Sequence, residues 1–180
     1  MTTDDPVVLL VDDSSNDSLL MRIVFERAGF LHPLHFAHGG DEAIAYLRGD
    51  GRYADRGLFP LPTTLLMDLN MPGKNGFEVL DWIRHQPYLR RLRVYILSAS
   101  SCLTDIQRAY DLGADSYLVK PGNFDGLLYL VNCLIAWLKL SHFAPPPPVQ
   151  DDFESLSPFP GASAPIEEDV RHGSLIRSAV

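Results

Sequence analysis

Short apolar runs alternate with stretches of helical periodicity along the first 140 residues of this 180-residue chain. The runs have the length of buried strands, and the stretches between them carry apolar residues three or four positions apart. We expect strands at 7–11, 34–37, 64–67, 94–97 and 116–119, and helices at 14–27, 41–48, 77–84, 104–112 and 124–140. Five strand–helix units in succession predict an α/β fold.

Units of this kind predict a five-stranded parallel sheet with right-handed crossovers and helices on both faces. In the strand order 2-1-3-4-5, the ligand crevice lies at the carboxyl ends of the first and third strands, where the order reverses. In the first helix, Ser14 is the expected N-cap and Gly29 the stop. Its buried stripe is expected to consist of Leu19, Leu20, Ile23 and Val24.

Charged residues stand at the carboxyl ends of three predicted strands. Asp12 and Asp13 follow VVLLV, Asp68 follows TTLLM, and Lys120 follows SYLV. Since parallel strands end at the same edge of a sheet, these groups are expected to meet. Two carboxylates ~4 Å apart repel by about 4 kcal/mol at an effective dielectric constant of ~20. The acids therefore need Lys120 or a divalent metal ion as a counter-charge.

Several alternative chemistries do not fit the segments after these strands. A phosphate-binding loop would need GxxxxGK and a dinucleotide site GxGxxG, whereas the chain reads VDDSSNDS. A phosphohydrolase of the haloacid dehalogenase type would need a second Asp where Asn70 stands. What remains is phosphoryl chemistry on Asp68, with Mg²⁺ held by Asp13 and Asp68 and with Lys120 pairing with a phosphoryl oxygen.

Four segments together resemble the receiver domain of two-component response regulators: VDDSSND, LLMDLNMPGKNGFEVL, YILSAS and SYLVKP. The resemblance covers about residues 6–140 and implies a CheY-like, flavodoxin-like (βα)5 fold. It implies that a partner histidine kinase phosphorylates Asp68 and that Mg²⁺ is the cofactor. It also implies that Asp13 and Asp68 bind the metal directly, that Asp12 supports it through water, and that the backbone carbonyl of Asn70 is the third protein ligand.

The resemblance also implies which residues respond to the phosphoryl group. Ser98 matches the hydroxyl residue that contacts it, Lys120 the lysine that pairs with it, and Tyr117 the aromatic switch residue. The peptide bond before Pro121 is often cis in this family. Phosphorylation would draw the Ser98 hydroxyl toward Asp68, and the vacated space would let Tyr117 turn inward. A plain sheet-edge role for Tyr117 is the alternative.

The chain divides into a receiver domain at 1–143 and a tail at 144–180. The tail has a proline run at 145–148 and is rich in Pro, Ser, Gly and acids, so we expect it to be disordered and not to form an output domain. With a formal net charge of −8, the chain shows no basic surface for nucleic acid. The segment 49–62 is longer than the ~2 to 6 residues usual between a helix and a strand. We expect a solvated insertion there, and an interaction loop is the alternative.

The two cysteines, Cys102 and Cys133, are expected to be buried and reduced. The amino terminus is acidic where a signal peptide would be basic. No apolar run reaches the ~18 to 20 residues of a membrane span. We therefore expect a cytoplasmic protein with no membrane partner.

A narrower resemblance rests on the expected single-domain architecture, the long loop at 49–62 before the third strand, and the stretch MDLNMPGKNGFEVLDWIR. These features resemble the small stand-alone response regulators that pair with bacterial phytochrome histidine kinases. The helix at 124–140 has more apolar residues than one buried stripe requires, with Tyr129 and Trp137 as candidates for a homodimer contact through the fourth and fifth helices. Core packing is the alternative for both residues.

If the chain has no effector domain, as we expect, these features predict a phosphorylation-controlled switch that signals to an unknown downstream protein by contact. The chain would promote only its own phosphorylation and dephosphorylation, so it is not expected to be an enzyme acting on an external substrate. The alternative is a binding or dimerisation module of the same fold that works without phosphorylation.

Overall fold

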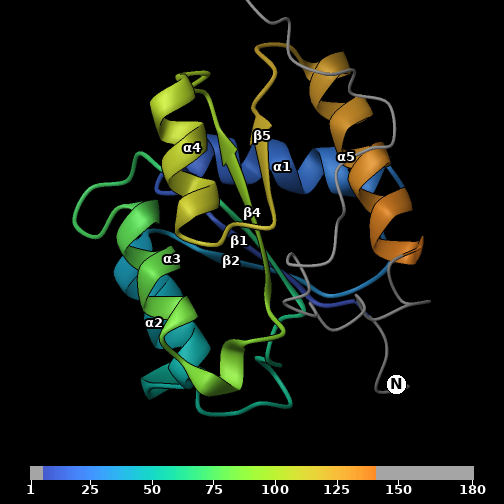
Figure 1. Ribbon diagram of the computed structural model, residues 1–180. Helices are drawn as coiled ribbons and strands as arrows, with labels where there is room; N and C mark the ends of the chain where they lie inside the picture. The colour runs from blue at the N-terminus through green and yellow to red at the C-terminus, as the bar shows by residue number, and fades with distance from the viewer. Residues whose placement is uncertain (1–5, 141–180) are drawn as a thin grey trace, which may run out of the picture. The chain divides into compact units, whose positions relative to one another are not determined.

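The computed structural model describes residues 6–140, which form a parallel sheet flanked by helices (Figure 1). The strands are β1 (Val8–Val11), β2 (Leu34–Ala37), β3 (Thr64–Met67), β4 (Arg93–Ser98) and β5 (Ser116–Val119). The helices are α1 (Ser15–Arg27), α2 (Gly40–Arg48), α3 (Gly76–Arg84), α4 (Leu103–Asp111) and α5 (Phe124–Leu140), with short 3₁₀ turns η1 (Gly51–Tyr53) and η2 (Pro87–Leu89).

The sheet has the predicted strand order, β2-β1-β3-β4-β5, and every neighbouring pair is parallel. The order reverses between β1 and β3, where Val11 is in register with Met67. Backbone hydrogen bonds continue past the strands, since the amide of Asp68 donates to the carbonyl of Val11 at 3.0 Å. The residues that follow β1 and β3 are therefore neighbours at the carboxyl edge of the sheet.

The core has two parts because the central strands β1, β3 and β4 are buried on both faces. Along β1, Leu9 and Val11 pack into a cluster with α2 and α3, whereas Val8 and Leu10 pack into a cluster with α1 and α5. Figure 1 shows the corresponding layers, with α2 and α3 on one side of the sheet and α1 and α5 on the other. This two-sided burial holds the carboxyl edge of the sheet in a fixed position.

The buried face of α1 differs from the predicted stripe. Leu19, Leu20 and Ile23 are exposed, and only Val24 of the predicted set is buried. The helix instead buries Ser18, Met21, Val24 and Phe25. Two sets of residues in this helix have helical spacing, and tertiary packing against the sheet and α5 selects the set that contains a serine. The predicted N-cap is confirmed, because Ser14 Oγ accepts a hydrogen bond from the amide of Asp17 at 3.2 Å.

The prediction of buried cysteines is wrong. Both thiols are free, and both residues are exposed. Cys102 is the N-cap of α4, in the loop after β4, so it precedes the packed part of that helix. Cys133 lies on α5 between the buried residues Val131 and Leu134, on the side of the helix that faces solvent. An apolar sequence context therefore did not mean burial in a helix whose outer face is itself rich in apolar residues.

The long segment 49–62 is packed against the domain. The guanidinium group of Arg56 donates hydrogen bonds to the carbonyls of Tyr46, Leu47 and Phe59 at 2.9, 2.8 and 3.2 Å. Two of these carbonyls belong to the last turn of α2. Carbonyl groups in the last turn of a helix have no hydrogen-bond partner within the helix. The segment thus closes the end of α2, so it is more than a solvated insertion.

The predicted tail, 144–180, lies outside the described residues, so its disorder and the domain boundary at 143 remain predictions. Among residues 6–140, no helix is both long and apolar enough to cross a membrane.

Candidate functional site

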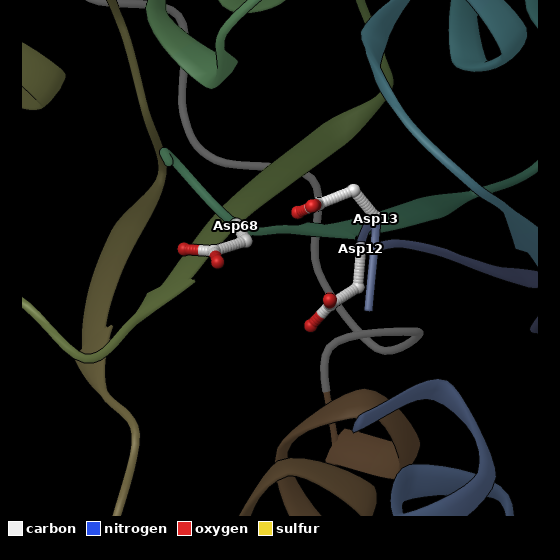
Figure 2. Close-up of side chains that lie close together, drawn as sticks. All are labelled: Asp12, Asp13 and Asp68. Atoms are coloured by element: carbon white, nitrogen blue, oxygen red, sulfur yellow. The ribbon is translucent and has the colours of Figure 1, made fainter. Parts of the chain in front are cut away.

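Three carboxylates meet at the carboxyl edge of the sheet, as the strand ends predict (Figure 2). One oxygen from each of Asp12, Asp13 and Asp68 lies within 4.8 Å of the others. Asp12 and Asp13 follow β1, and Asp68 follows β3. Asp12 is buried, Asp68 is half-buried and Asp13 is exposed. The group is therefore anchored on its Asp12 side and open to solvent on its Asp13 side.

Both carboxylate oxygens of Asp12 are engaged by the protein. Its Oδ1 accepts the backbone N–H of Ser14 at 2.9 Å, and its Oδ2 accepts a hydrogen bond from Lys120 Nζ at 2.8 Å. A carboxylate held in this way is suited to support a metal ion from outside its direct ligands. Asp13 and Asp68 are the better placed of the three acids for direct contact with an ion.

Asp68 is oriented by the loop that follows it. Its Oδ1 accepts the backbone N–H of Leu69 at 2.7 Å, while the amide of Asn70 is 3.5 Å away. The loop returns to α3 at Gly76, whose amide donates to the carbonyl of Leu69 at 3.0 Å. A Cβ at position 76 would lie 2.4 Å from the carbonyl oxygen of Asp68, so only glycine fits. Gly76 was not among the predicted site residues, although a glycine at the start of a helix is a signal of such close approach.

Ser98 lies on β4, and Tyr117 lies on the neighbouring strand β5. Ser98 is fully buried at the end of β4. The Tyr117 hydroxyl donates a hydrogen bond to the carbonyl of Ser100 at 2.9 Å, and the ring packs against the core cluster with α2 and α3. Burial raises the pKa of Tyr117, hydrogen bonds with Ser100 and Ser98 oppose this, and the charges of Asp105 and Asp68 add to the rise. The tyrosine hydroxyl is thus joined to the loop that follows Ser98.

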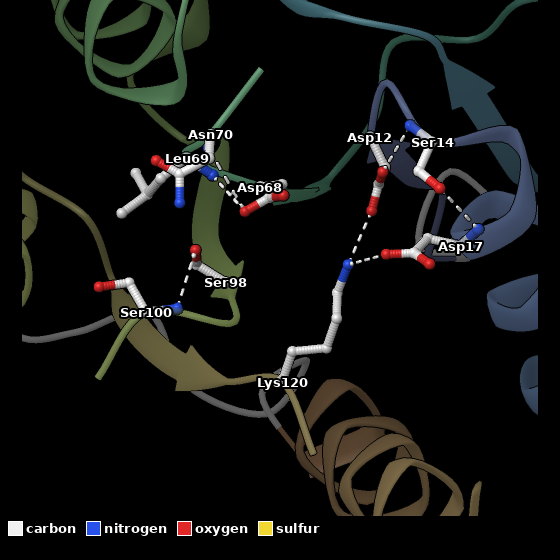
Figure 3. A network of polar contacts seen from close by, with 9 residues as sticks. All are labelled: Asp12, Ser14, Asp17, Asp68, Leu69, Asn70, Ser98, Ser100 and Lys120. Carbon is white, nitrogen blue, oxygen red and sulfur yellow. Dashed lines mark hydrogen bonds and ion pairs between the residues drawn. The ribbon is translucent and has the colours of Figure 1, made fainter. Parts of the chain in front are cut away.

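Lys120 extends from the end of β5 into the site (Figure 3). Its Nζ lies 2.8 Å from Asp12 Oδ2 and 2.8 Å from Asp17 Oδ2. Burial alone would lower the pKa of Lys120, but the hydrogen bonds and charges of Asp12 and Asp17 outweigh it and raise the pKa above its usual value. Asp17, in the first turn of α1, was not predicted as a site residue, since it stands at no strand end. Its proximity to the acidic pair in VDDSSND is the signal that was available.

The peptide bond between Lys120 and Pro121 is trans, because no cis bond occurs within the described residues. This differs from the isomer that is frequent in the family that the sequence resembles.

The charges and donor atoms at this edge fit a hard divalent cation. Within residues 6–140, the ammonium group of Lys120 pairs with Asp12 and Asp17, and no ion pair reaches Asp13 or Asp68. Carboxylate oxygens are the ligands that Mg²⁺ and related ions prefer. A cation bound there would relieve the repulsion between Asp13 and Asp68.

The fold and these strand-end residues define a recognisable class of protein. The family model for the response regulator receiver domain matches residues 8–132. The chain therefore belongs to the response regulator receiver domain family, the signalling modules of two-component systems.

Two relatives are similar over most of their own length. Response regulator Rcp1 of Synechocystis sp. is 36% identical over 134 residues, which cover 74% of this chain and 89% of Rcp1. The probable methanogenesis regulatory protein FilR2 of Methanothrix harundinacea is 36% identical over 131 residues, which cover 71% of this chain and 80% of FilR2.

Solved structures show the same fold. The crystal structure of the phosphorylated cyanobacterial phytochrome response regulator RcpA matches with a TM-score of 0.70 at 34% identity, covering 79% of this chain and 99% of RcpA. The Mn²⁺-bound form of Rcp1 matches with a TM-score of 0.67 at 36% identity, covering 74% of this chain and 95% of that one. The receiver fold predicted from the sequence is confirmed.

Proposed function

We propose that this chain is a phosphorylation-controlled response regulator that accepts a phosphoryl group on Asp68 from a sensor histidine kinase. The observation that carries the proposal is the meeting of Asp13, Asp68 and buried Asp12 at the carboxyl edge of the sheet, with Lys120 reaching the same edge. Asp68 is the best acceptor of the three acids. It is half-buried and fixed by Leu69, whereas Asp12 is enclosed and Asp13 is exposed.

The transfer needs little covalent chemistry from the protein. A carboxylate oxygen of Asp68 forms a P–O bond while the P–N bond to the kinase histidine breaks, and the imidazole retains the electron pair and takes up a proton. Hydrolysis later returns the carboxylate and releases inorganic phosphate. The chain thus takes the phosphoryl group from a donor onto its own side chain and passes it to no acceptor other than water.

We propose Mg²⁺ as the cofactor, held by Asp13 and Asp68 with the carbonyl of Asn70, and supported by Asp12. A bound Mg²⁺ would neutralise charge on the transferring phosphoryl group. The hard oxygen donors support this assignment, and so does the relative Rcp1, whose structure is of a Mn²⁺-bound form. The fixed position of Asp12 would keep Asp13 oriented as a ligand.

The test is incubation with a small phosphodonor, with and without Mg²⁺, followed by intact-protein mass spectrometry. We expect the wild-type protein to gain one phosphoryl group only when Mg²⁺ is present, and Asp68→Asn to gain none. Asp50→Asn is a matched control, because Asp50 is an exposed aspartate at the far end of α2. Equal labelling of wild type and Asp68→Asn would contradict the site. No labelling of the wild type, and no binding of Mg²⁺, would favour a receiver-fold module that works without phosphorylation.

We further propose that the kinase is of the bacterial phytochrome type. RcpA is a phytochrome response regulator, and this chain aligns with nearly all of it. FilR2, a probable methanogenesis regulatory protein, is as similar to this chain as Rcp1 is, at 36% identity. The test must therefore compare a phytochrome kinase with a kinase of another type. Phosphotransfer from a purified phytochrome kinase should be faster than from a histidine kinase that senses another signal. Equal or slower transfer from the phytochrome kinase would contradict this pairing.

We propose that Ser98 and Tyr117 transmit phosphorylation to the surface. The hydrogen bond from Tyr117 ends on Ser100, two residues beyond Ser98, and Ser100 Oγ donates to Asp105 Oδ2 in the first turn of α4 at 2.7 Å. Movement of Ser98 toward a phosphoryl group would therefore shift Ser100, and with it the hydrogen bonds of Ser100 to Tyr117 and to Asp105 of α4. The resulting surface change would be recognised by a downstream protein.

A homodimer through the face formed by α4 and α5 is part of this proposal. Large apolar side chains are exposed on α5, including Tyr129 at 73% and Trp137 at 60%. We expect sedimentation velocity to detect a dimer that Tyr129→Glu weakens. Leu31→Glu is the control, since Leu31 is 93% exposed but lies in the loop before β2. A monomer at every concentration, with and without phosphodonor, would contradict the dimer.

A further inference from the structure

Lys120 is held by two carboxylates on the side of the site away from Asp68 (Figure 3). Asp12 Oδ2 and Asp17 Oδ2 each lie 2.8 Å from its Nζ. Within the part of the chain that the structure describes, no ion pair joins Lys120 to Asp68. The cation expected to pair with a phosphoryl group is therefore already engaged elsewhere.

A phosphoryl group on Asp68 would compete for this cation. It would carry a charge of roughly −1.5 to −2 and present strong acceptor oxygens. An ammonium group has three N–H donors, and two of them are directed at Asp12 and Asp17. One donor remains, but both pairings hold Nζ on the side of the site away from Asp68 (Figure 3), so a movement of Nζ toward Asp68 stretches at least one of them.

The two carboxylates differ in how easily they can release the lysine. The Asp12 side chain is 5% exposed, so leaving it without a cation would strand a charge in the interior. The Asp17 side chain is 42% exposed, and water can solvate it when the lysine leaves. Asp17 is therefore the partner that gives way.

We propose that Asp17 is a positioning residue that competes with the phosphoryl group on Asp68 for the ammonium group of Lys120. The inference rests on the proposed function, because it presupposes a phosphoryl group at Asp68. Asp17 determines how readily the ammonium group of Lys120 moves from Asp17 to the phosphoryl group. By holding the lysine, Asp17 weakens the binding of phosphoryl-like anions at the site. This competition also links α1 to the phosphorylation state, because the ion pair between Lys120 and Asp17, in the first turn of α1, forms or breaks with it.

The affinity of the site for beryllofluoride in the presence of Mg²⁺, measured by ¹⁹F NMR, tests the competition. Asp17→Asn should bind about two- to fivefold more tightly than wild type, as expected for loss of a competing, partly exposed ion pair. Asp17→Glu retains a carboxylate within reach of Lys120 and should restore the wild-type affinity. Asp125→Asn is the matched control, because it removes an exposed carboxylate from the first turn of another helix. Affinity of Asp17→Asn that equals or falls below that of Asp125→Asn would overturn the proposal.

A measurement on the wild-type protein does not depend on the variants folding. The chain has three lysines, Lys74, Lys120 and Lys139, so ¹⁵N labelling of lysine gives few ammonium signals to assign. Beryllofluoride should shift the Lys120 ammonium resonance and the carboxyl ¹³C resonance of Asp17 together. An unchanged Asp17 resonance with beryllofluoride bound would overturn the proposal. Failure of the proposed function has a different signature, which is no binding to wild type or equal binding to Asp68→Asn.

Discussion

The hydroxyl of Tyr117 donates a hydrogen bond to the backbone carbonyl of Ser100 across a distance of 2.9 Å. This contact joins β5 to the loop between β4 and α4, which follows the buried residue Ser98 at the end of β4. The tyrosine ring also packs against the core, so its position depends on both the loop and the sheet. A change at Ser98 therefore has a direct route to Tyr117.

Tyr117→Phe removes this hydrogen bond and keeps the ring. We expect a loss of about 1 kcal/mol in the free energy of unfolding by urea, the usual net value of one such bond. Phosphoryl labelling of Asp68 should persist, while the changes that phosphorylation causes in the amide NMR signals of α4 should diminish. Tyr88→Phe, at an exposed tyrosine, is the control for loss of a hydroxyl. Full α4 changes in Tyr117→Phe would refute the switch role.

Asp13→Asn tests the metal site. The substitution leaves a side chain of the same shape but removes a charge from the most exposed of the three acids. Binding of Mn²⁺, followed by electron paramagnetic resonance, should weaken about tenfold or more, which corresponds to ~1.4 kcal/mol. The control Asp50→Asn should bind as wild type does. Unaltered Mn²⁺ binding in Asp13→Asn would exclude Asp13 as a ligand.

Arg56→Met tests the packing of segment 49–62. The arginine donates hydrogen bonds to three backbone carbonyls, two of them at the end of α2. Because these carbonyls would lose a charged donor, we expect the free energy of unfolding to fall by about 1 to 3 kcal/mol. Arg91→Met, at an exposed arginine in the loop before β4, should change it little. Equal stability of the two variants would mean that the segment is not anchored in solution.

His35 makes stability depend on pH below about pH 6.5. Burial lowers the pKa of His35 below 6.5, its Nε2 is buried without a hydrogen-bond partner, and its ring lies against Tyr46 and Phe59. The unfolded chain therefore binds the proton more readily than the folded chain does. The stabilisation from neutral His35 is complete above about pH 6.5 and is lost as the pH falls through the lowered pKa. In urea unfolding, His35→Leu should lose less stability than wild type as the pH falls over this range. Equal losses in the two proteins would contradict this role of His35.

Much of the fold was predictable because it depends on local patterns. Buried parallel strands are short apolar runs, and register brings their ends together, so Asp12, Asp13 and Asp68 could be placed from the sequence. The buried face of α1 could not, because two faces have helical spacing and contact with the sheet and α5 decides between them. The prediction that Cys133 is buried failed for the same reason, since α5 is apolar on its outer face as well.

The part of the site that escaped prediction depends on side-chain direction. Asp17 lies in a helix and follows no strand, and its role appears only because the flexible chain of Lys120 reaches toward α1. Gly76 likewise acts through a backbone approach to Asp68 that the loop conformation creates. The anchoring of segment 49–62 depends on the hydrogen bonds that the Arg56 guanidinium group donates to backbone carbonyls at the end of α2. Such contacts between distant parts of the chain leave no periodic signal in the sequence.

The central claim is that Asp68 carries the phosphoryl group. Borohydride reduces an aspartyl phosphate to homoserine, so peptide mass spectrometry of protein treated with phosphodonor, Mg²⁺ and then borohydride locates the modified residue. We predict homoserine at position 68 and at no other aspartate. Homoserine at position 12 or 13, or a phosphoprotein that yields no homoserine, would contradict the account.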